Sequence, residues 1–216
     1  MSIKLKSAYQ TKKIIKVMDE LYPEAECELI HHNPFELLIA VILSAQTTDV
    51  AVNKVTPALF ARFPDPLSLA QAGPSEVEPY IQSIGLYRNK AKHIVACSQQ
   101  LITEFGGEVP RSREALMSLA GVGRKTANVV MSVAFGLPAL AVDTHVERVS
   151  KRLDLVEQQA SPLQVEQQLV AKLTKKSLGK AHHSLIFFGR YFCTAKKPNC
   201  AQCPLLNYCR FGQSNV

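Results

Sequence analysis

The stretch GVGRKTA, Gly121 to Ala127, places two glycines and a lysine between two apolar helical patterns. A glycine pair between helices indicates a tight turn or a close backbone approach, because only glycine adopts positive φ without a steric penalty. The first N–H groups of the second helix lack intrahelical partners, and with the helix dipole they form an anion site. The stretch therefore predicts a helix-hairpin-helix over residues 112–135, with Gly121, Val122 and Gly123 placed to contact a phosphate.

Two nucleotide-binding motifs do not fit this stretch. A Walker A loop follows a strand and has glycine directly before Lys-Thr, whereas here Arg124 precedes Lys125 and a helix precedes the loop. The Rossmann pattern has a third glycine three residues after the second, where this chain has Thr126. A nucleic-acid phosphate is therefore the better ligand, and such contacts position a protein without reading base sequence.

Helix signals recur along the chain and strand alternation does not, which predicts an all-α protein. Asn33 caps an almost wholly apolar helix, Pro34 to Leu43, that we expect to be buried. Ser75 with Glu78 predicts a capping box at another helix start. The other predicted helices cover Tyr9–Leu21, Asp49–Phe60, Tyr87–Phe105, Ser112–Leu119, Thr144–Leu153, Pro162–Leu173 and Lys180–Phe192.

Composition narrows the class of protein and its partner. The chain has 216 residues, 47% hydrophobic and 20% charged, which suits one or two globular domains, with the best seam at Gly136 to Pro138. Lys and Arg number 25 against 18 Asp and Glu, and the net charge of +7 favours a polyanionic partner. The basic N-terminus has no apolar run behind it, so we expect no signal peptide, no membrane span and a cytoplasmic location.

The cysteines predict a metal site near the C-terminus. Four of the six form a C-x6-C-x2-C-x5-C array: Cys193, Cys200, Cys203 and Cys209. Without a secretory signal a disulfide framework is disfavoured. Cys₄ zinc sites usually pair two C-x2-C knuckles, and four cysteines also hold [4Fe–4S] clusters, so spacing favours the cluster and leaves zinc open. Cys27 and Cys97 stand apart and are expected in the core.

Two titratable residues are candidates for chemistry. Lys125 is unusual at a helix start, because its cation faces the positive end of the dipole. Burial and the dipole would favour the neutral amine and make it a nucleophile, and the alternative is that it only binds a phosphate. Asp143 in AVDTHVERV is most simply a helix cap, with Thr144 and Glu147 forming a capping box. His145 is expected to be an ordinary first-turn residue.

Lys196 and Lys197 lie between the first two predicted ligands, in a loop that a metal would hold rigid. They are candidates for phosphate contacts, and two solvated charges are an equally good interpretation.

Three separated motifs, LAGVGRKTANVV, AVDTHVERV and the cysteine array, together resemble the endonuclease III family of helix-hairpin-helix DNA glycosylases. The similarity continues in PFELLIAVILSAQTTDV and SIGLYRNKAKHI, and it spans essentially the whole chain. The resemblance implies a six-helix barrel domain at residues 22–137 and a cluster domain at residues 1–21 and 138–216, with DNA bound in the cleft between them. The resemblance also implies that the loop 193–209 binds one [4Fe–4S] cluster.

The resemblance further implies a monomeric base excision repair enzyme that removes oxidised pyrimidines from double-stranded DNA and then cuts 3′ to the abasic site. Lys125 matches the nucleophile that forms a Schiff base, and Asp143 matches the carboxylate that assists it. Gln46 and Leu86 match residues that fill the gap left by the flipped base. Relatives often have proline at the position of Ala120, whose loss would loosen the turn, and a basic residue at that of Asn199.

Two rival interpretations stay open at this point. An adenine glycosylase of the same superfamily shares the cysteine array, but it lacks the lysine and uses a glutamate on the early buried helix, where this chain has Ala40 to Leu43. A non-catalytic DNA-binding module needs only the hairpin and the basic surface, with Lys125 touching phosphate.

Overall fold

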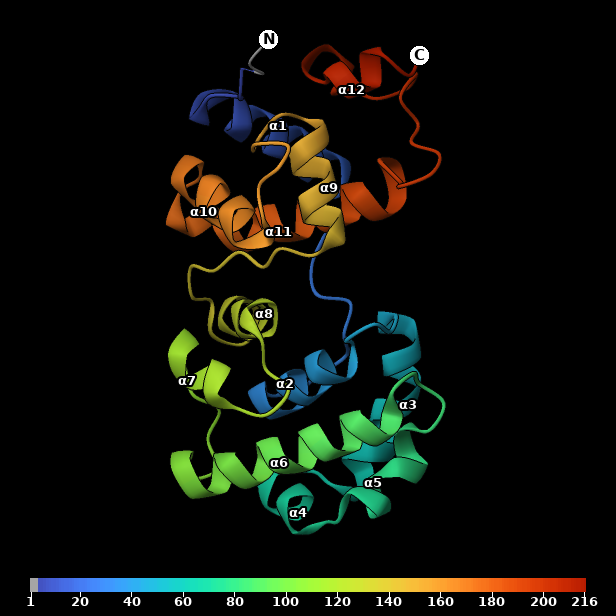
Figure 1. The fold of residues 1–216 in the computed structure, drawn as a ribbon, viewed down its shortest axis with the longest axis vertical. Coiled ribbons are helices and arrows are strands. Elements are labelled where there is room, and N and C mark those ends of the chain that lie inside the picture. Colours follow the sequence, from blue (N-terminus) through green and yellow to red (C-terminus); the bar gives the residue numbers. More distant parts are fainter. Residues whose placement is uncertain (1–3) are drawn as a thin grey trace. The chain divides into compact units, whose positions relative to one another are not determined.

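The structure is a computed structural model that describes residues 4–216 (Figure 1). This part of the chain forms helices and turns without a strand, which confirms the predicted all-α class. None of its helices is long and apolar enough to cross a bilayer. The chain forms two compact units. The middle unit is Cys27–Leu137, and the terminal unit consists of the segment that ends at Glu26 together with Pro138–Val216.

The helices divide between the two units as follows. The middle unit contains α2 (Pro34–Leu43), α3 (Asp49–Arg62), α4 (Pro66–Gln71), α5 (Pro74–Ile81), α6 (Tyr87–Phe105), α7 (Arg113–Ser118) and α8 (Arg124–Phe135). The terminal unit contains α1 (Ala8–Leu21), α9 (Thr144–Arg152), α10 (Pro162–Lys172), α11 (Leu178–Phe187) and α12 (Arg210–Gln213). It also has 3₁₀ turns at Lys175–Ser177 and Leu206–Tyr208 and a π-helical turn at Phe188–Phe192.

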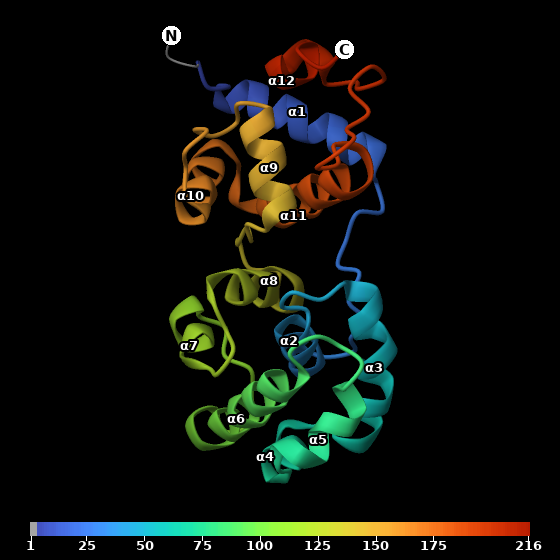
Figure 2. The same cartoon turned by 45° about the vertical axis from the view of Figure 1, so that its right-hand side comes forward.

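Helix α2 is the buried centre of the middle unit, as its sequence predicts. Every residue from Phe35 to Leu43 is buried, and α2 packs against α3, α6 and α8 (Figure 2). Asn33 caps it, because its Oδ1 accepts the N–H of Glu36 at 2.9 Å. Burial of each large apolar side chain stabilises the folded state by about 1.5–3 kcal/mol. Helix α2 is therefore a rigid element that holds the loops at its two ends in place.

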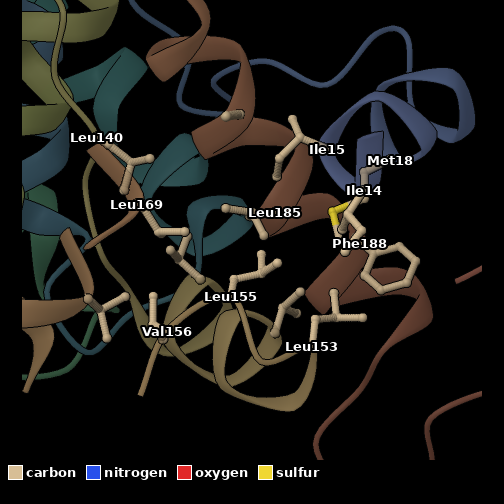
Figure 3. Close-up of a cluster of buried hydrophobic side chains, with 14 of the residues drawn as sticks. Ile14, Ile15, Met18, Leu140, Leu153, Leu155, Val156, Leu169, Leu185 and Phe188 are labelled. Carbon is tan, nitrogen blue, oxygen red and sulfur yellow. The ribbon is translucent and has the colours of Figure 1, made fainter. Parts of the chain in front are cut away.

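The terminal unit has its own apolar core. Figure 3 shows Ile14 and Met18 of α1 close to Phe188, with Leu153 and Leu155 from the end of α9 and the turn after it. The same core includes Cys209, and helix α12, which follows this cysteine, packs on α9. The N-terminal helix and the C-terminal third therefore fold as one body although about 120 residues separate them.

The structure confirms Asp143 as the cap of α9, but the two predicted capping boxes, at Ser75 and at Thr144, are wrong. The structure starts α5 at Pro74, which takes the first helical position, so Gly73 is the N-cap and its N–H donates to Glu76 Oε1 at 2.8 Å. The predicted Ser75–Glu78 box does not form. At α9 the cap is Asp143 itself, and Thr144 is already helical, so the predicted box with Glu147 does not form either.

Other differences concern helix ends and the two isolated cysteines. The predicted helix Lys180–Phe192 ends at Phe187 and continues as the π-helical turn, closed by the Cys193 N–H donating to Phe188 O at 2.7 Å. The short helix α4 was not predicted. Cys97 is buried as expected, and burial raises the pKa of its thiol to about 12, whereas Cys27 is only partly buried.

Candidate active site

The hairpin between α7 and α8 has the geometry that its glycines predict. Gly121 has φ 77°, and the Val122 N–H donates to Leu119 O at 3.1 Å, which closes a β-turn. A Cβ on Gly121 would lie 3.0 Å from His93 Cβ and 3.2 Å from Ile42 Cγ2. Both the backbone angle and the space therefore require glycine at this position.

A glutamine side chain braces the same turn. Gln100 of α6 accepts the Ala120 N–H on Oε1 at 2.7 Å, and its Nε2 donates to Ser118 O at 3.1 Å. A proline at position 120 would have no N–H to donate. Alanine at position 120 therefore keeps a hydrogen bond to Gln100 that a proline would lose.

The start of α8 has no side-chain cap and carries a lysine in its first turn. Gly123 is the N-cap and provides no side-chain capping bond, and the space around its Cα is open. Lys125 is the second residue of α8 and is exposed. The expected burial of Lys125 is therefore wrong, and its side chain is accessible to a ligand.

Asp143 is held by three hydrogen bonds at the start of α9. Its Oδ1 accepts the N–H groups of His145 and Val146 at 2.9 and 2.8 Å, and its Oδ2 lies 2.8 Å from His145 Nδ1. Burial on its own would raise the pKa of Asp143, but the hydrogen bonds from His145 and Val146 outweigh it and lower the pKa. Asp143 is thus an ionised, fixed carboxylate at neutral pH.

Sequence reasoning missed the part that His145 plays. An ionised carboxylate only accepts hydrogen bonds. His145 Nδ1 therefore carries a proton and donates a hydrogen bond to Asp143 Oδ2. A second histidine, the buried His182 of α11, places its Nδ1 2.9 Å from Ala141 O, two residues before Asp143. The D-x-H spacing at the helix start could have indicated the first contact, but only the fold brings His182 to this segment.

Gln46 and Leu86 share an unusual backbone conformation. Their φ angles are 54° and 60°, in the left-handed region that non-glycine residues rarely adopt. Both residues are exposed, and Leu86 shows 55% of its surface. Left-handed non-glycine residues persist where the surrounding structure holds them, often at functional sites.

The four predicted cysteine ligands come together in the terminal unit. Cys193, Cys200, Cys203 and Cys209 line one pocket, and none of the four thiols forms a disulfide. Across residues 4–216, no three His, Cys, Asp or Glu side chains converge closely enough to hold a single metal ion. Four sulfur ligands around a wider space suit an iron–sulfur cluster, in which each cysteine binds its own iron, better than one tetrahedral zinc ion.

Two arginines of α9 hold the loop that begins at Cys193. Arg152 donates to Thr194 O at 2.8 Å, to Ala195 O at 3.0 Å and to Cys193 Sγ at 3.3 Å. Arg148 donates to Cys193 O at 3.3 Å and to Gly189 O in the preceding π-helical turn at 2.7 Å. Lys196 and Lys197 follow directly and are exposed, so their side chains extend from a backbone that α9 already fixes.

Comparison with known proteins shows to which family these features belong. Residues 39–175 match the model of the HhH-GPD superfamily base excision DNA repair protein, and residues 193–209 match the iron-sulfur binding domain of endonuclease III. Endonuclease III of Bacillus subtilis is 57% identical over 90% of this chain and 89% of its own length. The chain belongs to the endonuclease III family. The Escherichia coli K12 member is 43% identical over 92% of this chain and 94% of its own.

Solved structures agree with this assignment. A trapped covalent intermediate of endonuclease III with DNA matches with a TM-score of 0.94 and 52% identity, covering 98% of this chain and 99% of the other. A thermostable thymine-DNA glycosylase, 24% identical, shares the fold with a TM-score of 0.86 and coverage of 95% and 98%. The chain is therefore a base excision repair DNA glycosylase with abasic-site lyase activity. It binds DNA and carries one [4Fe–4S] cluster.

Proposed function

We propose that Lys125 is the nucleophile of this glycosylase and lyase, acting on oxidised pyrimidines and abasic sites in duplex DNA. The exposed amine directly after an open helix start supports this assignment, because a phosphate bound at Gly121 to Gly123 would bring the sugar of the same strand to the lysine. The trapped covalent intermediate of the related endonuclease III adds support, since a covalent complex requires a nucleophile on the enzyme.

The proposed reaction starts from a base flipped out of the helix, which costs least when the base is damaged and poorly stacked. The neutral amine of Lys125 attacks C1′ as the bond from C1′ to the base breaks, and the proton that the amine loses passes to the departing base. The bond from C1′ to O4′ then breaks and O4′ takes up a proton from water, which leaves a protonated imine between C1′ and Lys125. The imine acidifies the 2′ position, so loss of a 2′ proton expels the 3′ phosphate. Water finally hydrolyses the imine and releases Lys125.

Asp143 assists as a fixed negative charge. Its lowered pKa keeps it ionised at neutral pH, so it stabilises the positive charge that develops on the sugar and accepts a proton during the steps that follow. The hydrogen bonds from Val146 and His145 hold the carboxylate in one orientation, which lowers the cost of reaching the reactive geometry.

Gln46 and Leu86 fill the space that the flipped base leaves. Their exposure on left-handed loop positions supports this role, because an apolar wedge and an amide can replace stacking and base-pair hydrogen bonds. We further propose that Lys196 and Lys197 contact phosphates, that the four cysteines of residues 193–209 ligate the cluster, and that the enzyme works as a monomer in the cytosol, where chromosomal DNA is its substrate.

Borohydride trapping tests the nucleophile. A duplex with one oxidised pyrimidine is incubated with wild type, Lys125→Gln and Asp143→Asn, and covalent complexes are counted on a denaturing gel. Wild type should be trapped, Lys125→Gln should bind the duplex without trapping or cutting, and Asp143→Asn should be trapped slowly. Lys92→Gln, which changes an exposed lysine of α6, serves as the control and should be trapped like wild type.

Retained cutting by Lys125→Gln would overturn the assignment of the nucleophile. Active, DNA-binding wild type that releases base without any trapped complex would favour a hydrolytic glycosylase, with Lys125 as a phosphate contact. Release of adenine rather than an oxidised pyrimidine would contradict the proposed substrate class.

A further inference from the structure

Two loops of the middle unit contain a non-glycine residue in the left-handed conformation, which neighbouring groups must stabilise. Gln46 lies in the loop after α2, and Leu86 is the residue directly before α6. Among residues 4–216, they share positive φ with only one other non-glycine residue, Asp154 of the terminal unit. Leu86 also provides no side-chain capping bond to α6. A backbone of this kind keeps its shape only when neighbouring groups fix it.

One residue contacts both loops. Lys90, the fourth residue of α6, donates its backbone N–H to Leu86 O at 3.0 Å. Its Nζ donates to Thr47 Oγ1 at 2.6 Å, across 43 positions of sequence. Thr47 is the residue after Gln46, and its N–H donates to Ser44 O at 3.0 Å. Lys90 therefore contacts the loop of Leu86 through its backbone and the loop of Gln46 through its side chain.

The burial of Lys90 is costly and stability alone does not explain it. The residue is only 3% exposed, and burial lowers the pKa of its amine. Among the described residues, the hydroxyl of Thr47 is its hydrogen-bond acceptor and no carboxylate forms an ion pair with it. An apolar side chain of the same length would fill this space without a desolvation cost. A buried lysine with a single neutral acceptor points to a role other than packing.

We propose that Lys90 is a positioning residue that couples the loops of Gln46 and Leu86, so that both side chains enter the DNA together. The proposal rests on the gap-filling role given above to Gln46 and Leu86. Without the contact between Lys90 and Thr47 each loop adopts its left-handed conformation separately, and the enzyme orders both during binding. Affinity for gapped DNA then falls, because the ordering cost is met at that moment.

The experiment uses the whole protein with its cluster and a duplex that carries a tetrahydrofuran abasic analogue opposite 2-aminopurine. Lys90→Met keeps the length and apolar stem of the side chain, and Thr47→Val keeps the shape of the threonine. Loss of one hydrogen bond to a charged group should weaken binding of this duplex about tenfold in either variant. The change in 2-aminopurine fluorescence on binding, which reports insertion beside that base, should shrink in both. The double variant should lose no more than either single variant.

Matched variants separate the possible outcomes. Lys92→Met removes an exposed lysine two residues along α6 and controls for charge, so its fluorescence change should equal that of wild type. Leu86→Ala and Gln46→Ala test the premise, and if both insert like wild type, the gap-filling role itself fails. If these two lose insertion while Lys90→Met and Thr47→Val keep it, the coupling is wrong. If Lys90→Met does not fold, the affinity and fluorescence change of Thr47→Val test the proposal alone. If the losses of affinity add in the double variant, Lys90 and Thr47 act independently and the proposed coupling is wrong.

Discussion

His145 donates twice to Asp143, through its backbone N–H to Oδ1 at 2.9 Å and through Nδ1 to Oδ2 at 2.8 Å. The side chains are 26% and 17% exposed, so solvent screens this pair only in part. The carboxylate is thereby ionised, oriented and attached to the first turn of α9 at once. In the proposed mechanism the histidine acts through Asp143, by fixing its orientation and charge.

This pair predicts a dependence on pH. The folded pKa of Asp143 lies below its ordinary value, so its contribution to stability is present above an unfolded pKa of about 3.9 and is lost as pH falls through the folded pKa. His145→Phe keeps a ring and removes the Nδ1 donor, which should raise the pKa of Asp143. The acidic limb of kcat/KM for strand cutting should move to higher pH. An unchanged limb would show that the ionisation of Asp143 does not control the rate.

Gly189 should not tolerate a side chain. A Cβ there would lie 2.9 Å from His145 Cβ and 3.1 Å from Val149 Cγ2, so α9 and the π-helical turn would have to separate. Gly189→Ala should destabilise the protein by about 1–3 kcal/mol through overpacking and should slow strand cutting by moving Asp143. Chemical unfolding and single-turnover rates measure the two effects. Gly85→Ala is the control for stability, because its Cβ would meet open space.

The hairpin brace predicts a coupling between Gln100 and Ala120. Gln100→Leu removes both hydrogen bonds and should cost about 1–2 kcal/mol of unfolding free energy. Ala120→Pro removes the donor of one bond, so the cost of Gln100→Leu should be smaller in that background by about 1 kcal/mol. Gln99→Leu, whose side chain bonds to Ala70 O instead, should show no coupling with Ala120→Pro. Equal costs in both backgrounds would contradict the brace.

Arg152 should be needed to retain the cluster. Its guanidinium reaches Cys193 Sγ, two carbonyl oxygens of the following loop and the ring of Phe211, whose centroid lies 4.2 Å away. Arg152→Lys keeps the charge but cannot present the same planar set of donors, so we expect faster loss of iron and faster proteolysis of the loop. Visible absorbance per protein and limited digestion measure both. Normal iron retention in Arg152→Lys would show that charge alone suffices.

The two loop lysines should affect the salt dependence of DNA binding. Each phosphate contact contributes about −0.9 to the slope of log K against log salt, so Lys196→Ala and Lys197→Ala should each reduce the slope by about 1 on any duplex sequence. Lys175→Ala removes an exposed lysine outside the proposed interface and should leave the slope unchanged. Binding isotherms at several salt concentrations decide between a phosphate contact and a solvated charge.

Much of the local structure follows from the sequence because its causes are local. Apolar periodicity, the Asn33 cap and the glycines of the hairpin predict α2, α8 and the turn between α7 and α8. Where local signals compete, the sequence was less reliable. Pro74 starts a helix that the sequence also allowed to start with Ser75 as its cap, and the short helix α4 has too few residues for a clear period, whereas the cap at Asp143 was predicted correctly.

The sequence by itself determined the helical class, the hairpin and the cysteine array. Helix signals act within a few residues, and the spacing of the cysteines can be read directly from the sequence. The tertiary structure decided which distant side chains complete the site. Lys90 reaches Thr47, Gln100 reaches Ala120, and Gly189 allows α9 to approach the π-helical turn. Such contacts depend on how helices pack in three dimensions, and periodicity along one helix shows which face is buried but not what it meets.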